Sequence, residues 1–272
     1  MERQRPPVAR SILFVPATRP ERIAKAFASG ADAVVLDLED AIGPSDKDAA
    51  REALIAALDQ ARPVIVRING VESEWFEQDM AACGHPGIAG IMLPKVETAA
   101  SVQAVHNRRH LPVTALIETA RGLWNALEIA QAPGTQRLAF GALDFRLDLG
   151  LPDAGHEQLA VYRSRLVLAS RVAMLAPPID APTPSFTDLA QVRAESEAAR
   201  RLGFGGKLCI HPDQVAIVNE SFLPSVVEVE WARKVVAAAR AAGGAAVAVD
   251  GRMVDRPVID LAERILAQSR VN

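Results

Sequence analysis

VTALIET (residues 113–119) and RLAFGALDF (137–145) are two apolar runs separated by one helix-length segment, and each carries an acid near its end. These acids are Glu118 and Asp144. A strand buried on both faces is apolar, and a carboxylate does not stabilise it. Acids at the carboxyl ends of neighbouring parallel strands therefore typically point to a bound ion or to a catalytic site. The pair predicts a metal site at the mouth of a parallel barrel.

Similar β-rich runs alternate with amphipathic, helix-like segments along the chain, and several of those segments end in glycine. The eight runs are SILFVPA (11–17), AVVLDLE (33–39), PVIVRIN (63–69), GIMLPK (90–95), VTALIET, RLAFGAL, the weaker PPIDAPT (177–183) and KLCIHP (207–212). Eight strand–helix units are what a TIM (β/α)8 barrel needs, so we expect an α/β protein with this barrel over residues 1–222. Residues 223–272 form an additional C-terminal helical segment, which we expect to pack on the barrel or on a neighbouring subunit.

The composition of the chain reduces the number of function classes to consider. The chain has 272 residues, 50% of them hydrophobic, and a net charge of −3, so nucleic acid and anionic membranes are unexpected partners. The start has no apolar run typical of a signal peptide, and no stretch reaches the roughly 18 to 20 apolar residues of a membrane span. Cys83 and Cys209 lack metal-ligand spacing. We expect a cytoplasmic protein with reduced cysteines and a small-molecule substrate.

Polar residues at the ends of the predicted strands are the candidates for chemistry, because active sites of such barrels lie at the carboxyl face. They are Asp37, Glu39, Asp40, Arg67, Asn69, Lys95, Glu118, Asp144 and His211. The acids outnumber the cations, and apposed carboxylates require a cation. A donor set made of oxygen alone favours Mg²⁺ over zinc or copper.

Structural interpretations stay open beside these. Glu118 and Asp144 can each cap the following helix, where the dipole favours an acid. Asp40 can cap a helix or pair with Lys47, and Arg67 can pair with an acid inside the barrel or bind a carboxylate or thioester oxygen. His211 is better explained as a hydrogen-bonded structural residue than as a base.

Taken together, the motifs resemble the citrate lyase beta-subunit-like family, which includes malyl-CoA and citramalyl-CoA lyases. The resemblance spans Arg10 to about Leu266. The matching stretches are RSILFVPATRPERIAKA, GADAVVLDLEDAIGPSDKDAAR, VRIN, GIMLPKVE, LIETARGL, FGALDF, LGFGGKLCIHPDQV and GRMVDRPVID.

The resemblance implies a homotrimeric or hexameric TIM barrel in which Glu118 and Asp144 bind Mg²⁺. It also implies that Arg67, Gly141 and Ala142 contact the substrate, and that Asp37, Glu39 and Asp40 of DLED position metal-bound waters. Asp255, in the C-terminal motif, is expected to reach a neighbouring subunit's site as general acid or base. Two departures from the family pattern, Leu143 and Thr18, bear on acyl specificity.

The expected function is that of a magnesium-dependent carbon–carbon lyase. It would cleave or form a 3-hydroxyacyl thioester of the malyl-CoA, citramalyl-CoA or citryl type through a thioester enolate, with an acyl-CoA and a 2-oxo acid as partners. One alternative is a metal-dependent 2-oxo acid aldolase without CoA. Another is a citryl-thioester lyase subunit that works inside a larger complex.

Overall fold

The structure is a computed structural model that describes residues 8–151, 153–242 and 246–269. It consists of two compact units, one formed by Val8–Asn219 and the other by the chain from Glu220 on. None of the helices in the described part of the chain combines the length and the apolarity that a membrane crossing requires.

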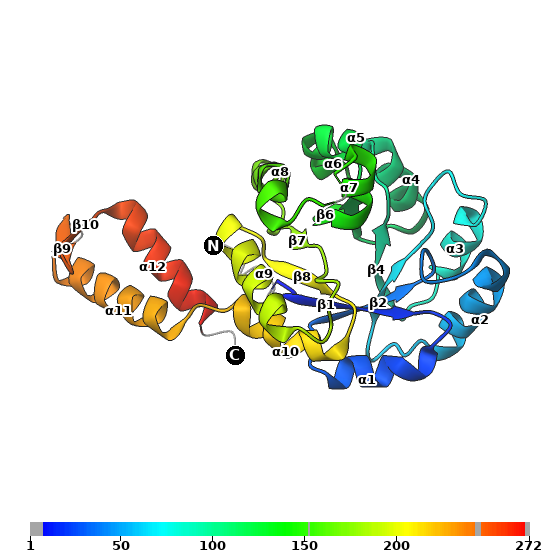
Figure 1. Cartoon of the computed structure of the whole chain (residues 1–272), viewed down its shortest axis with the longest axis horizontal. Coiled ribbons are helices and arrows are strands. Elements are labelled where there is room, and N and C mark those ends of the chain that lie inside the picture. The colour runs from blue at the N-terminus through cyan, green and yellow to red at the C-terminus, as the bar shows by residue number, and fades with distance from the viewer. Residues whose placement is uncertain (1–7, 152, 243–245, 270–272) are drawn as a thin grey trace. The chain divides into compact units, whose positions relative to one another are not determined.

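The larger unit is a closed barrel of eight parallel strands in sequential order, with β8 pairing back to β1 (Figure 1). The strands are β1 (Ser11–Pro16), β2 (Ala33–Asp37), β3 (Val64–Arg67), β4 (Ile88–Leu93), β5 (Val113–Ile117), β6 (Thr135–Phe140), β7 (Ile179–Asp180) and β8 (Gly206–Cys209). All eight predicted runs contribute a strand, and the predicted TIM barrel is confirmed.

Helices connect the strands on the outside of the barrel. They are η1 (Pro20–Arg22), α1 (Ile23–Ala28), η2 (Pro44–Asp46), α2 (Lys47–Ala57), α3 (Phe76–Ala82), α4 (Ala99–Arg109), α5 (Ala120–Trp124), α6 (Ala126–Gln131), α7 (Ala142–Leu149), α8 (His156–Val172), α9 (Leu189–Leu202) and α10 (Pro212–Ser221). One boundary differs from the prediction: the apolar run that ends at Phe145 is not one strand. β6 stops at Phe140, and Asp144 lies in the first turn of α7.

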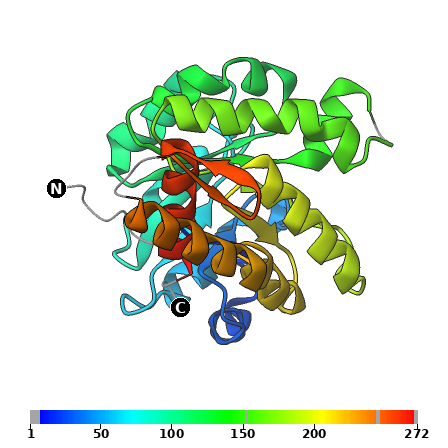
Figure 2. The same cartoon turned by 90° about the vertical axis from the view of Figure 1, so that its left-hand side faces the viewer.

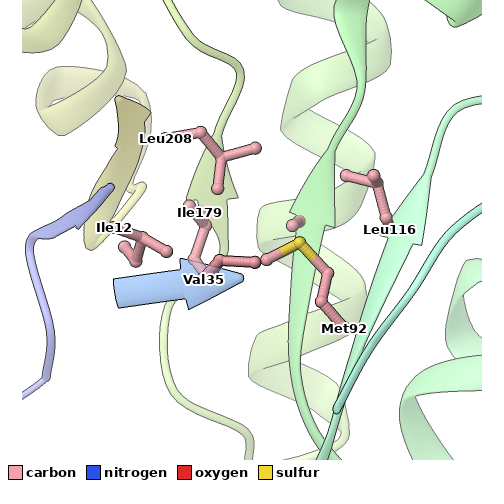
Figure 3. Close-up of a cluster of buried hydrophobic side chains, with 7 residues drawn as sticks. Ile12, Val35, Met92, Leu116, Ile179 and Leu208 are labelled. Carbon is pink, nitrogen blue, oxygen red and sulfur yellow. The ribbon is translucent and has the colours of Figure 1, made fainter. Parts of the chain in front are cut away.

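The barrel interior is filled by apolar side chains. Seven of the eight strands each place one buried residue in a single cluster, namely Ile12, Val35, Met92, Leu116, Ala139, Ile179 and Leu208 (Figure 3). Ile65 of β3 packs against this cluster. Burial of such side chains stabilises the fold by roughly 1.5–3 kcal/mol each. The packed interior leaves the polar strand ends at the carboxyl face to form a site.

The smaller unit is a helical hairpin. α11 (Val226–Ala241) and α12 (Arg256–Gln268) pack side by side, and the antiparallel strands β9 (Val247–Val249) and β10 (Arg252–Val254) lie between them in the chain (Figure 1 and Figure 2). Its own core includes Ala232, Val235 and Ile265.

Candidate active site

A cavity of about 600 Å³ opens where the barrel strands end. It is lined by one residue at the carboxyl end of each of seven strands, namely Pro16, Asp37, Arg67, Glu118, Phe140, Asp180 and Ile210. Other lining residues are Gly141, which precedes α7, Ala142, Asp144 and Arg146 of α7, and His156 at the start of α8. The position matches the carboxyl-terminal face at which parallel barrels place their active sites.

Glu118 follows directly after β5 and is only 2% exposed. Its Oε1 accepts a hydrogen bond of 2.7 Å from the backbone N–H of Lys95. Capping does not explain this acid, because the side chain that caps α5 is that of Thr119. Burial, reinforced by the negative charges of Glu39 and Asp144, raises the pKa of Glu118 to about 8.

Asp144 lines the same cavity from the first turn of α7. A helix start stabilises a carboxylate through its dipole, so this interpretation of Asp144 holds as well. Its side chain makes no cap hydrogen bond, since Gly141 occupies the N-cap position. The dipole therefore supports the charge of Asp144 while leaving its oxygens free to bind a ligand.

Arg67 pairs with an acid inside the barrel. Its Nε and Nη2 donate to the two oxygens of Asp37 at 2.7 and 2.6 Å, and its Nη1 lies 2.9 Å from Glu39 Oε2. Lys95 reaches the other oxygen of Glu39 at 2.5 Å. Of the five N–H groups of the guanidinium, those on Nε and Nη2 that face Asp37 are hydrogen-bonded, and Nη1 is held in an ion pair. Because Arg67 also lines the cavity, its remaining N–H groups are available to a substrate oxygen.

A second network lies behind the DLED loop. Lys47 forms no ion pair with Asp40 among the described residues; its Nζ donates to the carbonyl oxygens of Leu38 and Glu39 and to Asn69 Oδ1 at 2.6–2.8 Å. Asn69 is buried and also donates to Asp79. Asn69 is therefore a scaffold residue that does not line the cavity, and Lys47 fixes the backbone that carries Glu39.

Four other candidates are not among the residues that line the cavity, namely Glu39, Lys95, His211 and Asp255. His211 stacks on Phe186, with ring centroids 5.1 Å apart, and its Nδ1 accepts from the backbone N–H of Asp213. This is the structural role preferred from the sequence. Asp255 belongs to the smaller unit, where its side chain caps α12 by accepting from Val258 N–H at 3.5 Å.

Sequence reasoning missed a group of charged residues on strands β7 and β8 and on helices α8 and α9. Arg163 and Lys207 both pair with Asp180, at 2.8 and 2.9 Å, and His156 Nε2 lies 3.1 Å from Glu195. The signal was present in the sequence, because Asp180 and Lys207 are charges inside strand-like runs. Arg163 and His156 come from α8, a helix whose approach to the cavity no local pattern indicates.

The donor set suits a hard cation. Glu118 and Asp144 make no ion pair with any described lysine, arginine or histidine, although both line the cavity. The described residues contain no cluster of three or more His, Cys, Asp or Glu side chains arranged as a metal site. A site with two protein carboxylates fits Mg²⁺, which commonly keeps several waters and takes further oxygens from its substrate.

We expect the metal-free protein to lose stability as the pH rises from about 4.5 to 8. In this window the folded state keeps a proton on Glu118 and the unfolded state has released it, so the free energy of unfolding falls by up to about 1.4 kcal/mol per pH unit. Urea denaturation across the window measures this slope. The Glu118→Gln variant should show a smaller slope, and an unchanged slope would contradict the assignment.

We expect Gly141→Ala to displace the Glu118 carboxylate. A Cβ on Gly141 would lie 2.3 Å from Oε2 and 2.6 Å from Cβ of Glu118, so one of the two segments must shift. The overpacking should cost about 1–3 kcal/mol of stability, and the misplaced carboxylate about 100-fold in turnover. Gly43→Ala is the matched control, because its nearest neighbour would lie at 3.8 Å. Equal behaviour of the two variants would contradict the prediction.

The chain is similar to several known proteins. Residues 10–212 match the family model described as HpcH/HpaI aldolase/citrate lyase. The chain is 37% identical to a citrate lyase subunit beta-like protein of Deinococcus radiodurans, over 96% of this chain and 98% of that protein. It is 36% identical to a (3S)-malyl-CoA thioesterase of Cereibacter sphaeroides, over 96% and 94% of the two chains.

The fold is also similar to that of a solved relative. The crystal structure of CitE from Mycobacterium tuberculosis, in complex with magnesium, acetoacetate and coenzyme A, superposes with a TM-score of 0.87 at 38% identity. The match covers 96% of this chain and 98% of that one. Since the family model and full-length relatives agree, this chain belongs to the HpcH/HpaI aldolase/citrate lyase family.

Proposed function

We propose that the chain is a magnesium-dependent lyase that cleaves, or in reverse forms, the carbon–carbon bond of a 3-hydroxyacyl-CoA thioester of the malyl, citramalyl or citryl type. The observation that carries the proposal is the pair Glu118 and Asp144, without a cation partner among the described residues, in a cavity that also contains Arg67. The CitE relative, which binds magnesium and coenzyme A, supports both ligands.

Glu118 and Asp144 would hold the ion. Bound there, Mg²⁺ supplies Lewis-acid polarisation of the oxygen on the hydroxyl-bearing carbon. The Lys95 N–H that donates to Glu118 Oε1 fixes the orientation of that carboxylate, and Gly141 leaves room for its other oxygen. In this proposal, Asp37, Glu39 and Asp40 position water at the site.

The reaction breaks the bond between the hydroxyl-bearing carbon and the carbon next to the thioester carbonyl. The hydroxyl passes its proton to water at the site and its oxygen becomes the carbonyl oxygen of the oxo acid, while the electrons of the broken bond form a thioester enolate that is then protonated on carbon. Arg67 would stabilise the enolate oxygen with N–H groups that its contacts with Asp37 leave free. An oxyanion donor of this kind typically contributes about 10²–10³ to the rate.

Asp255 would exchange the proton with the enolate carbon from a neighbouring subunit. This role is supported by the resemblance of its GRMVDRP segment to the family motif, and its capping of α12 holds its backbone in place. Mixing two inactive variants, Glu118→Gln and Asp255→Asn, tests it. Transfer in trans predicts that activity returns in mixed oligomers; no recovery, with subunit exchange verified by mass spectrometry, would contradict it.

A homotrimer or hexamer is part of the same proposal. Large apolar side chains are exposed on the smaller unit, among them Val226, Val227 and Met253 at 72–74%. Exposed apolar patches typically mark contact surfaces. A monomer in sedimentation analysis at micromolar concentration would contradict both the oligomer and Asp255 acting in trans.

Thioester hydrolysis is the second candidate, because one of the relatives is named a (3S)-malyl-CoA thioesterase. Hydrolysis breaks the C–S bond with water and releases free CoA and a hydroxy acid. Lyase cleavage releases an oxo acid and leaves the thioester intact. The two reactions therefore differ in which new functional group appears.

One assay separates the candidates. The purified chain with Mg²⁺ is given malyl-, citramalyl- and citryl-CoA, and free thiol and 2-oxo acid are measured in parallel. We expect oxo acid without thiol; thiol without oxo acid would establish the hydrolase. Turnover by the isolated chain would exclude a subunit that works only inside a larger complex, and acyl-CoA binding by calorimetry would exclude an aldolase that uses no CoA.

A further inference from the structure

The cavity contains one arginine whose charge is not neutralised by the described residues. The two other arginines that line it form ion pairs with acids: Arg67 pairs with Asp37, and Arg163 pairs with Asp180. Arg146 forms no ion pair with any described Asp or Glu, and its polar contacts are two backbone carbonyl oxygens. A guanidinium in a ligand cavity without a carboxylate partner is available to an anion of the ligand.

The backbone contacts fix the place of this charge. Arg146 Nε donates to the carbonyl oxygen of Ala142 and Nη1 to that of Ala154, both at 3.2 Å. The side chain thus folds back along α7 toward its first turn. That turn follows Gly141, whose Cα lies against the Glu118 carboxylate. Arg146 therefore lines the same cavity as the two proposed metal ligands, Glu118 and Asp144, and shares α7 with Asp144.

The residues around Arg146 leave its charge in place. Leu143, on the same helix, is apolar, lines the cavity and is 61% exposed. Neutral carbonyl groups orient the guanidinium without cancelling its charge. Of its five N–H groups, at least two stay free for a bidentate contact with a carboxylate.

We propose that Arg146 binds a second carboxylate on the oxo-acid half of the substrate. This inference rests on the proposed function, in which the first carboxylate and the adjacent oxygen lie at Glu118 and Asp144. It selects a four-carbon 2-oxo dicarboxylic acid, and hence a citryl-type thioester, over the three-carbon monocarboxylic acid of a citramalyl thioester. The two thioesters differ by one carboxylate, so Arg146 is the residue that discriminates between them.

Kinetics on this matched pair test the inference. The quantity is the ratio of kcat/KM for citryl-CoA to kcat/KM for citramalyl-CoA, measured from the oxo acid released. We expect Arg146→Gln to lower the ratio about 100-fold, as loss of a charged partner in a specificity site does. Arg146→Lys should restore part of the ratio. Arg171→Gln, on the exposed end of α8, is the matched control and should leave the ratio unchanged.

A binding measurement separates this inference from the proposed function. Malate and lactate also differ by one carboxylate, and calorimetry with the magnesium-loaded protein compares their affinities. We expect tighter binding of malate, with the difference lost in Arg146→Gln. If no thioester is cleaved but this difference is seen, the proposed function fails and the Arg146 assignment stands.

Two results would overturn the assignment. One is an equal loss of kcat/KM on both thioesters in Arg146→Gln, which places Arg146 on a shared part of the substrate such as a phosphate of the carrier. The other is an unchanged ratio together with an unchanged preference for malate over lactate. Either would leave the lyase activity itself established by the wild-type turnover.

Discussion

The Glu118→Gln variant is expected to lose magnesium-dependent turnover by about 10³-fold or more while remaining folded. Gln keeps the shape of the side chain and can still accept from Lys95 N–H, so the loss isolates the charge. The negative charge strengthens the binding of a divalent cation to a carboxylate oxygen, and Lewis-acid stabilisation by the cation is worth several kcal/mol. Steady-state kinetics with added Mg²⁺, and with EDTA as the metal-free reference, measure the effect.

The stability of the Glu118→Gln variant provides a second test. Because Glu118 is buried with a raised pKa, its neutral replacement should make the metal-free protein more stable at pH 8, whereas stabilisation by added Mg²⁺ should disappear. Glu128→Gln, an exposed acid on α6, is the control and should keep both turnover and the response to Mg²⁺. Full activity of Glu118→Gln would exclude Glu118 as a metal ligand.

The barrel could be predicted from the sequence because its strands are buried on both faces and are therefore continuous apolar runs. The weakest run, PPIDAPT, became the shortest strand, Ile179–Asp180, which has only two residues in the barrel. Boundaries were less certain where apolarity continues across a turn. In RLAFGALDF the same kind of residue fills the end of β6 and the start of α7, so only Gly141 marked the change.

The acids of the site could be predicted because each follows a strand at the carboxyl face. The contacts among them could not, since pairing depends on rotamers and on distances across the barrel. Lys47 illustrates this: its nearness to Asp40 in sequence suggested an ion pair, and the lysine instead holds two carbonyl groups of the DLED loop. Arg146 was missed for the same reason, because a helical arginine gives no sign that it turns toward a cavity.

The buried ion pairs around Asp180 should contribute more to the stability of the fold than to catalysis, and Lys207→Met tests this. Lys207 is 1% exposed, and its Nζ lies 2.9 Å from Asp180 and 3.6 Å from Glu195. Removing one partner of such a buried network leaves Asp180 with one of its two cations, and breaking a buried ion pair typically costs about 3–5 kcal/mol. We expect urea denaturation to show a loss of that size, and Lys25→Met, an exposed lysine on α1, to change stability by less than about 0.5 kcal/mol.

The size of the Lys207→Met effect also shows whether Asp180 needs one cation or two. Arg163 remains on Asp180 in this variant, at 2.8 Å, so a loss below about 1 kcal/mol would mean that one cation is enough to hold the carboxylate. A full loss would mean that Asp180 needs both, because the guanidinium and the ammonium engage different oxygens of the same carboxylate. In that case Asp180, which lines the cavity, is held in place only while both cations are present.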